Sequence, residues 1–359
     1  MNSMTTQVFA VKEPGAGDPG AGDPGAGDHG VAEAARILRE GGLVAIPTET
    51  VYGLAANALN AQAVTHIFRA KGRPQDNPLI VHVASPEWLP RYALEIPDAA
   101  YRCVEAFWPG PLTMVLKKRS VIPDVVSAGL DTAGFRCPSH PVASAVIAAA
   151  GVPLAAPSAN TSGLPSPTLA EHVLADLGGK IDAIVDGGPC DVGVESTVLL
   201  LTGKVPCILR PGGVTLEQLR AVLGEVTVDP AVTHMLKAGR KVASPGMKYK
   251  HYSPKAHVRI VRGDAQAYAA YVNALPGPVT ALCFEGEQPL LRVPCVTYGC
   301  AHDGASQARR LFDALRHLDE IGARDVYARC PDEDGVSLAV YNRLLRAAGF
   351  EIIDPAAGQ

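Results

Sequence analysis

A short loop carries two cationic residues that could bind a phosphate chain. Residues 71–78 read KGRPQDNP and lie between an expected helix and an expected strand. Lys71 offers an ammonium group and Arg73 a planar guanidinium, on a loop stiffened by prolines, and this combination suits a triphosphate. An ordinary solvated basic loop would show the same pattern, so these residues alone do not fix a function.

A second group of small polar residues follows the strand expected at 152–156. Residues 156–163 read APSANTSG, and Ser166 and Thr168 come shortly after. Ligands of α/β sheets bind at the carboxyl ends of strands, where hydroxyl and amide groups can hydrogen-bond phosphate or ribose oxygens. The alternative is that Ser166 or Thr168 only caps the helix that follows.

Other polar residues stand where further strands begin or end. Residues 47–54, PTETVYGL, follow a strand and could also be a simple turn. Thr132, Arg136, the run EST at 195–197 and the run RPGG at 210–213 form the last group. An arginine before Pro-Gly-Gly at a strand end is well placed to meet an anion, although such an arginine is more often a surface residue.

The sequence lacks the usual signatures of covalent or metal catalysis. It contains no GxxxxGK[ST], HExxH or GxSxG motif, and its histidines do not show metal-ligand spacing. A GxGxxG match begins at Gly15, inside the threefold PGAGD repeat of residues 14–28, where no strand precedes it and no helix follows. The site is therefore expected to work by positioning and electrostatics.

Alternating strand and helix patterns predict an α/β protein of two domains. Residues 1–29 are expected to be a flexible tail, 30–226 the first domain, 227–256 a linker and 257–354 a smaller, doubly wound domain. In the first domain we expect helices at 31–40, 61–70, 99–107, 142–150, 169–177 and 215–223, and strands at 43–46, 78–83, 113–117, 152–156, 183–185, 197–201 and 207–209, the last two antiparallel. In the second domain we expect strands at 258–261, 279–284, 292–297 and 326–328, and helices at 265–275, 305–321 and 338–348.

Composition narrows the class of protein. The 359 residues are 47% hydrophobic and 19% charged, which permits a substantial core. The net charge of −4 argues against binding to bulk nucleic acid or to an anionic membrane. No apolar run is long enough for a transmembrane helix and no secretory signal is visible, so we expect no membrane association. The eight cysteines form no CxxC pair, which favours reduced thiols and a cytoplasmic protein.

Taken together, the motifs identify a family. The ordered runs PTETVYGL, KGRPQDNPLIVHV, APSANTSG with SPT, ESTV and RPGG resemble those of the threonylcarbamoyl-AMP synthases, which have a YrdC-like fold. The run SPGMKYKHYSP at 244–254 and the second α/β domain are similar to the longer, two-domain branch of that family. The resemblance covers residues 30 to 352. It implies a YrdC-like twisted mixed sheet, joined by a long linker to a smaller Rossmann-like α/β domain.

The resemblance also implies the reaction of a nucleotidyltransferase. L-threonine, bicarbonate or CO2, and ATP would give L-threonylcarbamoyladenylate and pyrophosphate. That product donates threonylcarbamoyl to the adenosine next to the anticodon in certain tRNAs, in a step carried out by a separate, transiently contacted transfer complex. Mg²⁺ would arrive with ATP rather than on protein ligands, no organic cofactor is implied, and the adenylation step would not require tRNA.

Residue roles follow from matching the family motifs. The catalytic signature falls on Lys71, Arg73, Ser158 and Asn160. The resemblance assigns ATP to Arg73, Asn77, Thr132, Ser158, Ser166 and Arg210, with Tyr252 of the linker, or failing that Tyr249. It assigns L-threonine to Thr50, His82, Arg136, Ala156 and Ser196. The linker and second domain would close over the active site. Ser253 stands where the family pattern has alanine, and the PGAGD repeat has no counterpart there.

Three other interpretations stay open. The same fold could serve as an RNA-binding module, although the acidic balance and the few aromatic residues count against it. It could be the carbamoyl-transfer part of a maturation protein, but such proteins carry zinc-binding cysteine pairs, and this chain has none. The second domain could instead serve regulation or oligomerisation.

Overall fold

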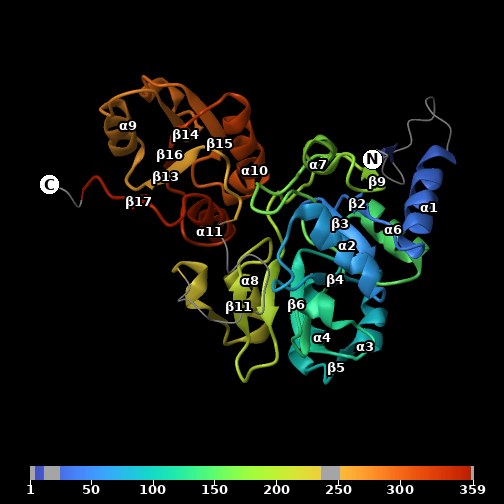
Figure 1. Ribbon diagram of the computed structural model, residues 1–359. Helices are drawn as coiled ribbons and strands as arrows, with labels where there is room; N and C mark the ends of the chain where they lie inside the picture. The colour runs from blue at the N-terminus through green and yellow to red at the C-terminus, as the bar shows by residue number, and fades with distance from the viewer. Residues whose placement is uncertain (1–4, 12–24, 236–250, 357–359) are drawn as a thin grey trace.

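Two sheets, one of twelve strands and one of five, organise the described part of the chain (Figure 1). The computed structural model describes residues 5–11, 25–235 and 251–356. The large sheet lies in the first domain and the small sheet in the C-terminal domain, so the predicted α/β class with two domains is confirmed. Among the described residues, none of the helices combines the length and apolar character needed to cross a bilayer.

The large sheet is mixed and runs in the order β1-β9-β2-β3-β8-β4-β7-β6-β10-β11-β12, with β5 paired to β6. Strands β10 and β11 are antiparallel, as predicted. The strands are β1 (Gln7–Ala10), β2 (Val44–Ile46), β3 (Gly53–Asn57), β4 (Ile80–His82), β5 (Ala93–Leu94), β6 (Leu112–Lys118), β7 (Thr132–Arg136), β8 (Leu154–Ala155), β9 (Ala183–Asp186), β10 (Thr197–Leu200), β11 (Cys207–Arg210) and β12 (Thr227–Val228).

Helices cover this sheet and bury an apolar core against it. They are α1 (Gly25–Arg39), α2 (Ala61–Lys71), α3 (Leu89–Tyr92), α4 (Asp98–Phe107), α5 (Asp124–Ser127), α6 (Pro141–Ala150), α7 (Ala170–Leu177) and α8 (Leu216–Leu223), with 3-10 turns η1 (Pro86–Trp88) and η2 (Pro230–Val232). Helix α2 shows how the sequence sets its limits. The Asn60 side chain caps its first turn, and Gly72 ends it in the left-handed conformation, with φ at +62°.

The C-terminal domain has a fully parallel sheet in the order β15-β14-β16-β13-β17. This is the doubly wound arrangement that the alternating pattern predicts. Its elements are β13 (His257–Val261), α9 (Ala265–Asn273), β14 (Val279–Glu285), η3 (Gln288–Leu290), β15 (Cys295–Cys300), α10 (Gly304–Glu320), β16 (Asp325–Arg329), α11 (Ser337–Ala347) and β17 (Ile352–Ile353).

The two domains pack directly on each other through α10 and α11 (Figure 1). Gly193 of the first domain lies so close to α10 that a Cβ atom there would sit 2.4 Å from the Ala308 carbonyl oxygen. Val51 and Val194 of the first domain belong to the same buried apolar cluster as Tyr252 and the α10 and α11 side chains. The C-terminal domain therefore shares a core with the first domain.

The N-terminal region differs from the expectation of a flexible stretch over residues 1–29. Gln7–Ala10 forms strand β1, which pairs in parallel with β9, and helix α1 begins at Gly25 rather than near residue 31. Gly30 allows α1 to approach β1 closely, because a Cβ atom there would lie 3.0 Å from Val11 and 3.1 Å from Phe9. At β1, tertiary pairing thus overrides local composition. Most of the PGAGD repeat lies outside the described residues.

Candidate active site

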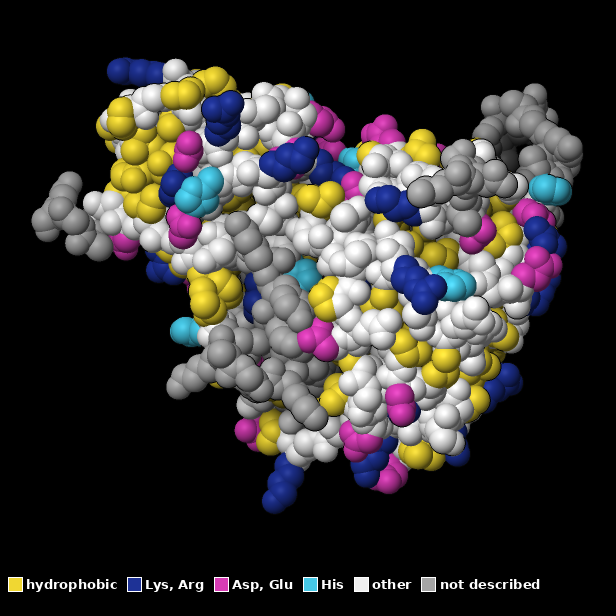
Figure 2. Space-filling view, viewed as in Figure 1, with side chains coloured by type: hydrophobic (Ala, Val, Ile, Leu, Met, Phe, Trp, Pro, Cys, Tyr) yellow, Lys and Arg dark blue, Asp and Glu magenta, His cyan; other side chains and the backbone are white. Residues whose placement is uncertain are grey.

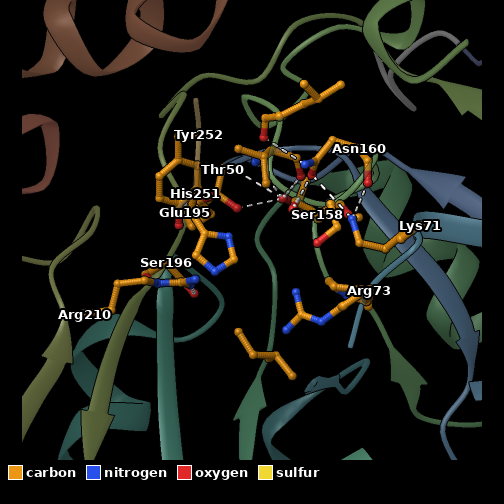
Figure 3. Close-up of a pocket in the computed structure, with 18 of the residues that line it drawn as sticks. Thr50, Lys71, Arg73, Ser158, Asn160, Glu195, Ser196, Arg210, His251 and Tyr252 are labelled. Atoms are coloured by element: carbon orange, nitrogen blue, oxygen red, sulfur yellow. Dashed lines mark hydrogen bonds between the residues drawn. The ribbon is translucent and has the colours of Figure 1, made fainter. Parts of the chain in front are cut away.

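A single pocket gathers most of the polar residues that the sequence singles out (Figure 3). The volume of the pocket, including the space at its open mouth, is about 720 Å³. The pocket lies where loops and strand ends of the first domain meet the end of the linker. The lining residues are Thr48, Thr50, Val51, Gly53, Lys71, Arg73, Ile80, His82, Arg136, Ala156, Pro157, Ser158, Asn160, Ser162, Gly163, Leu164, Glu195, Ser196, Arg210, His251 and Tyr252.

Lys71 ends helix α2 and turns its side chain inward, so that only 1% of the residue is exposed. Its Nζ donates hydrogen bonds to the carbonyl oxygens of Ser158 and Asn160 (Figure 3). Burial, reinforced by the positive charge of Arg73, lowers the pKa of Lys71 well below its usual value. A bound anion would therefore stabilise the desolvated ammonium group, which contacts carbonyl oxygens.

Arg73 lies two residues beyond Lys71, across the left-handed turn at Gly72. Its Nη2 donates to the carbonyl oxygens of Asn77 and Pro78 at 3.3 and 3.2 Å. Its Nε has no hydrogen-bond partner among the described residues, although the atom is buried. Burial lowers the pKa of Arg73 to about 10, so the guanidinium remains charged at neutral pH. The Nε–H group of Arg73 is therefore available to bind a ligand.

The loop after β8 forms the floor of the pocket and is held by its own side chains. Ser158 Oγ donates to Asn160 Oδ1 at 2.6 Å, and Asn160 Nδ2 donates to the carbonyl oxygens of Thr161 and Leu164 at 2.8 and 2.9 Å. The backbone bridges to Gly53, and the Gly163 carbonyl oxygen accepts from Ser253 N at 2.9 Å. These bonds fix the loop between the PTETVYGL segment and the end of the linker.

Arg136 ends strand β7 and also lines the pocket, beside His82 at the end of β4. Arg136 Nη2 lies 2.9 Å from Glu49 Oε1, while its Nε has no hydrogen-bond partner among the described residues. Burial and the charge of Arg136 lower the pKa of His82 to about 3, so this imidazole is neutral at physiological pH. A buried guanidinium with a free N–H suits a carboxylate ligand.

Arg210 ends strand β11 and reaches across to the start of β10. Its Nε and Nη2 donate to the Ser196 carbonyl oxygen at 3.2 and 3.0 Å. Gly212 makes this arrangement possible, because a Cβ atom there would lie 2.2 Å from Thr197 N and 2.4 Å from the Glu195 carbonyl oxygen. The glycine of the RPGG run is thus required by close backbone contact.

Glu195 is the carboxylate among the lining residues. Its Oε1 accepts from Ser166 Oγ at 2.7 Å, and its Oε2 accepts from Arg343 Nε at 2.8 Å. Burial would raise its pKa, but the charges of Arg343 and Arg210 and the bond from Ser166 lower it to about 2. Glu195 is therefore ionised at neutral pH, with both oxygens engaged.

His251 and Tyr252, at the end of the linker, close one side of the pocket (Figure 3). The Tyr252 ring packs against Phe312 of α10, with 5.2 Å between ring centroids. Burial lowers the pKa of His251 to about 3, helped by the neighbouring Arg73, so the imidazole is neutral. The wall formed here is aromatic and uncharged.

The pocket as a whole is built to receive an anion. Lys71, Arg136 and Arg210, which are buried, and Arg73, which is partly buried, bring four cationic side chains to it, against the ionised Glu195 and the nearby Glu49. Buried charges interact far more strongly than exposed ones, so this excess of positive charge favours a polyanionic ligand. By contrast, Lys and Arg side chains on the face shown in Figure 2 are scattered among acidic ones.

Comparison with known proteins gives the family. Two family models match, one described as telomere recombination over residues 36–212, and one described as the C-terminal domain of threonylcarbamoyl-AMP synthase over residues 214–349. A threonylcarbamoyl-AMP synthase of Pyrococcus abyssi is 47% identical over 326 residues, which cover 89% of this chain and 94% of that protein. The chain belongs to the threonylcarbamoyl-AMP synthase family.

Further relatives support the same assignment to the threonylcarbamoyl-AMP synthase family. The enzyme of that name from Bacillus subtilis is 44% identical over 328 residues, covering 90% of this chain and 94% of the relative. A crystal structure described as Pyrococcus abyssi Sua5 complexed with L-threonine is 43% identical, with a TM-score of 0.86 over 97% of this chain and 99% of that one. The resemblance stated from the motifs is confirmed, and so is the two-domain fold.

Most residues expected from the threonylcarbamoyl-AMP synthase motifs lie together in the pocket. They are Thr50, Lys71, Arg73, His82, Arg136, Ala156, Ser158, Asn160, Ser196, Arg210 and Tyr252. Three others stand behind or beside it. Asn77 is buried under Arg73, Ser166 lies behind Glu195, and Thr132 lines a small neighbouring hollow that shares Ile80 with the main pocket. Tyr249 lies outside the described residues.

The sequence motifs did not identify several of the residues that line the pocket. Thr48 and Gly53 come from the PTETVYGL run, whose signal was visible without pointing to particular side chains. His251 belongs to the linker motif and could have been chosen with Tyr252. Glu195 stood in a motif that was noted, but its partner Arg343 is 148 residues away and no local pattern links the two.

Proposed function

We propose that this chain is a threonylcarbamoyl-AMP synthase that joins L-threonine, CO2 or bicarbonate, and ATP to give threonylcarbamoyl-AMP and pyrophosphate. The observation that carries the proposal is the pocket itself, which is lined by four cationic side chains together with the Ser158–Asn160 loop. A site with this charge suits two anionic substrates, a triphosphate and a carboxylate. The relatives that share both domains carry the same name.

ATP would lie over the Lys71 and Arg73 end of the pocket. Lys71 and the free edge of Arg73 would hold phosphate oxygens, together with Ser158 and Asn160 of the loop. Arg210 would contact the nucleotide from β11, with Ser166 close behind. The adenosine end would extend past Asn77 toward the hollow beside Thr132, with Tyr252 as the aromatic wall.

L-threonine would lie at the other end of the pocket. Arg136 would bind its carboxylate as a fork, sharing its charge between the ligand and Glu49. The neutral His82, Thr50, Ser196 and the backbone at Ala156 would contact the rest of the amino acid. Hydrogen bonds to the threonine hydroxyl would reject valine, because valine would leave those polar groups unpaired. Serine lacks only a methyl group, so its rejection is worth only about 1–3 kcal/mol.

The chemistry would proceed in two steps. The neutral amine of threonine adds to CO2 and loses a proton, giving a carbamate. A carbamate oxygen then attacks the α-phosphorus in line, and the bond from that phosphorus to the pyrophosphate oxygen breaks. Lys71 and Arg73 would stabilise the charge that develops on the phosphate oxygens. Exclusion of water matters because the carbamate is labile, and we assign that role to the linker end with His251 and Tyr252.

Mg²⁺ would enter as part of the nucleotide substrate. Within the described ranges, no three His, Cys, Asp or Glu side chains group together as metal ligands, and Glu49 and Glu195 are each paired with an arginine. The product would pass to a tRNA threonylcarbamoyl-transfer complex in the cytoplasm, without tRNA binding in the adenylation step. These assignments rest on the family resemblance.

The test is pyrophosphate release from ATP and bicarbonate, measured with and without L-threonine, with serine and valine as controls. We expect release that requires both threonine and bicarbonate, is weaker with serine and is absent with valine. Absence of threonine-dependent release would refute the proposal. In that case filter binding to tRNA without ATP would test the RNA-binding alternative.

A further inference from the structure

A buried carboxylate in an anion-binding pocket needs an explanation. Glu195 lines the pocket and is ionised, yet only 6% of the residue is exposed to solvent. An uncompensated negative charge here would repel a triphosphate and would compete for Arg210. The groups that face it are cationic or neutral at neutral pH, namely Arg343, Arg210, Lys71, His251, Tyr252 and the Ser166 hydroxyl.

Arg343 of helix α11 provides the strongest of these contacts. It is 0% exposed, which is rare for an arginine. Its Nε donates to Glu195 Oε2 at 2.8 Å, its Nη1 donates to the Pro211 carbonyl oxygen at 2.6 Å, and its Nη2 lies 3.4 Å from the Glu195 carbonyl oxygen. One guanidinium thus holds the Glu195 segment and the RPGG loop together.

These contacts determine what remains available to a ligand. Arg343 donates to Glu195 Oε2 and Ser166 donates to Oε1, so these two bonds hold the carboxylate in place and weaken its attraction for Arg210. Arg210 instead donates to Ser196 and stays among the lining residues. The Arg343 guanidinium also lies 5.8 Å from the centroid of the Tyr252 ring, on the aromatic wall.

We infer that Arg343 is a positioning residue of the nucleotide site, supplied by the C-terminal domain, which holds Glu195 in a charge-compensated position and leaves Arg210 free for the triphosphate. This inference rests on the proposed function. It gives the C-terminal domain a part in substrate binding beyond covering the pocket. It also explains why an ionised glutamate is compatible with a phosphate site.

The decisive comparison is between a variant that removes one charge of the Arg343–Glu195 ion pair and a variant that removes both charges. Loss of Arg343 alone leaves a buried, unpaired charge, whereas loss of both charges leaves a neutral pair. We would therefore prepare Arg343→Met, Arg343→Lys, and the double variant Arg343→Met with Glu195→Gln. Arg310→Met is the control, because Arg310 pairs with Glu285 on the surface of the same domain. Circular dichroism and thermal melts would check folding.

Binding of a nonhydrolysable ATP analogue by calorimetry is the main measurement, with KM for ATP and for threonine as the second. We expect Arg343→Met to raise the Kd for the analogue at least tenfold and the KM for threonine less than threefold. The double variant should recover to within about threefold of wild type. Arg343→Lys keeps the positive charge but loses the planar guanidinium, so we expect a smaller rise in the Kd for the analogue. If Arg343→Met does not fold, Arg343→Lys takes its place in the comparison.

Two results would overturn the inference. One is wild-type affinity in folded Arg343→Met or, where Arg343→Met does not fold, in Arg343→Lys. The other is a folded double variant that binds as weakly as Arg343→Met, which would mean that Arg343 does not act through the charge of Glu195. Wild-type protein that binds no analogue at all would instead refute the proposed function, so the two failures can be told apart.

Discussion

Arg136, which lines the pocket, forms an ion pair with the neighbouring Glu49, with 2.9 Å between Nη2 and Oε1. Both side chains are nearly fully buried, at 5% and 7% exposure, and come from segments 87 residues apart in the chain. The Arg136 Nε atom keeps no hydrogen-bond partner among the described residues. The pair therefore holds the guanidinium in place while leaving it able to bind a second carboxylate.

This geometry predicts a selective effect of Arg136→Lys. Lysine keeps the charge but cannot contact Glu49 and a substrate carboxylate with a planar fork. We expect KM for threonine to rise about 10- to 100-fold, in the range of one lost charge-assisted hydrogen bond, while KM for ATP changes less than threefold. Steady-state pyrophosphate release, with each substrate varied in turn, measures both. Equal changes in the two constants would contradict the assignment of Arg136 to threonine.

Substitution of Lys71 tests the phosphate end of the pocket. Its buried ammonium group is held by the carbonyl oxygens of Ser158 and Asn160, so Lys71→Ala removes a cation that no solvent ion replaces easily. We expect kcat to fall at least about 100-fold, as for other lost transition-state donors. Arg73→Ala should behave similarly. Lys117→Ala is the control, since Lys117 pairs with Glu95 on the surface. Near-normal turnover in both Lys71→Ala and Arg73→Ala would refute this part of the site.

The sequence predicted the longer helices and most strands, because their apolar residues recur at regular spacing, but not the four-residue helices α3 and α5. It missed β7, whose run TAGFR is short, contains glycine and has few apolar positions. It assigned no strand to the residues of β3, the first two of which end the PTETVYGL run that could also be a turn. Strand β3 pairs with β2 and β8, and strand β7 pairs with β4 and β6. These pairings, more than the residues of the short strands themselves, define both strands.

The same limit applies to the site. Local motifs indicated the Lys71 loop and the Ser158–Asn160 loop, because each carries its chemistry within a few residues. The Glu195–Arg343 contact joins two segments in different domains, and Arg343 stands in an ordinary amphipathic helix pattern. Only the packing of α11 against the first domain brings that arginine into contact with Glu195 of the pocket lining.

The buried His82 predicts a dependence of stability on pH. Its pKa is lowered from 6.5 in the unfolded chain to about 3 in the folded protein, by burial and by Arg136. Between these values the unfolded state binds a proton that the folded state does not. The free energy of unfolding should therefore decrease as pH falls below about 6.5, by up to about 1.4 kcal/mol per pH unit from this residue.

Urea unfolding at pH 7.5 and 5.5, compared between wild type and His82→Asn, isolates this contribution. The loss of stability on going to pH 5.5 should be smaller in the variant. His317→Gln is the control, because His317 is half exposed and pairs with Glu320 on the surface of α10. An identical pH dependence in wild type and His82→Asn would show that this imidazole is not held neutral by the fold.

The last prediction concerns the junction between the domains at Arg316 and Asp176. Arg316 of α10 donates to both carboxylate oxygens of Asp176, at 3.1 and 3.0 Å, and to the Pro165 carbonyl oxygen at 2.6 Å. Asp176 in turn accepts from Thr161 N at 3.1 Å, next to Asn160 of the pocket floor. The exposures of the two side chains are 11% and 6%. Arg316 therefore ties the C-terminal domain to the loop that holds Lys71.

Removal of Arg316 alone leaves Asp176 as a buried, unpaired carboxylate. Arg316→Met should therefore lower the free energy of unfolding by about 3 kcal/mol. Arg310→Met offers a matched control on the same helix, since its partner Glu285 is exposed and the expected loss is under about 1 kcal/mol. Urea unfolding measures both, and limited proteolysis reports whether the domains separate. Adding Asp176→Asn to Arg316→Met should restore part of the stability, because the stranded charge is removed. Equal stability of the Arg316→Met and Arg310→Met variants would mean that the junction is held by the shared apolar core around Val51 and Val194 rather than by this ion pair.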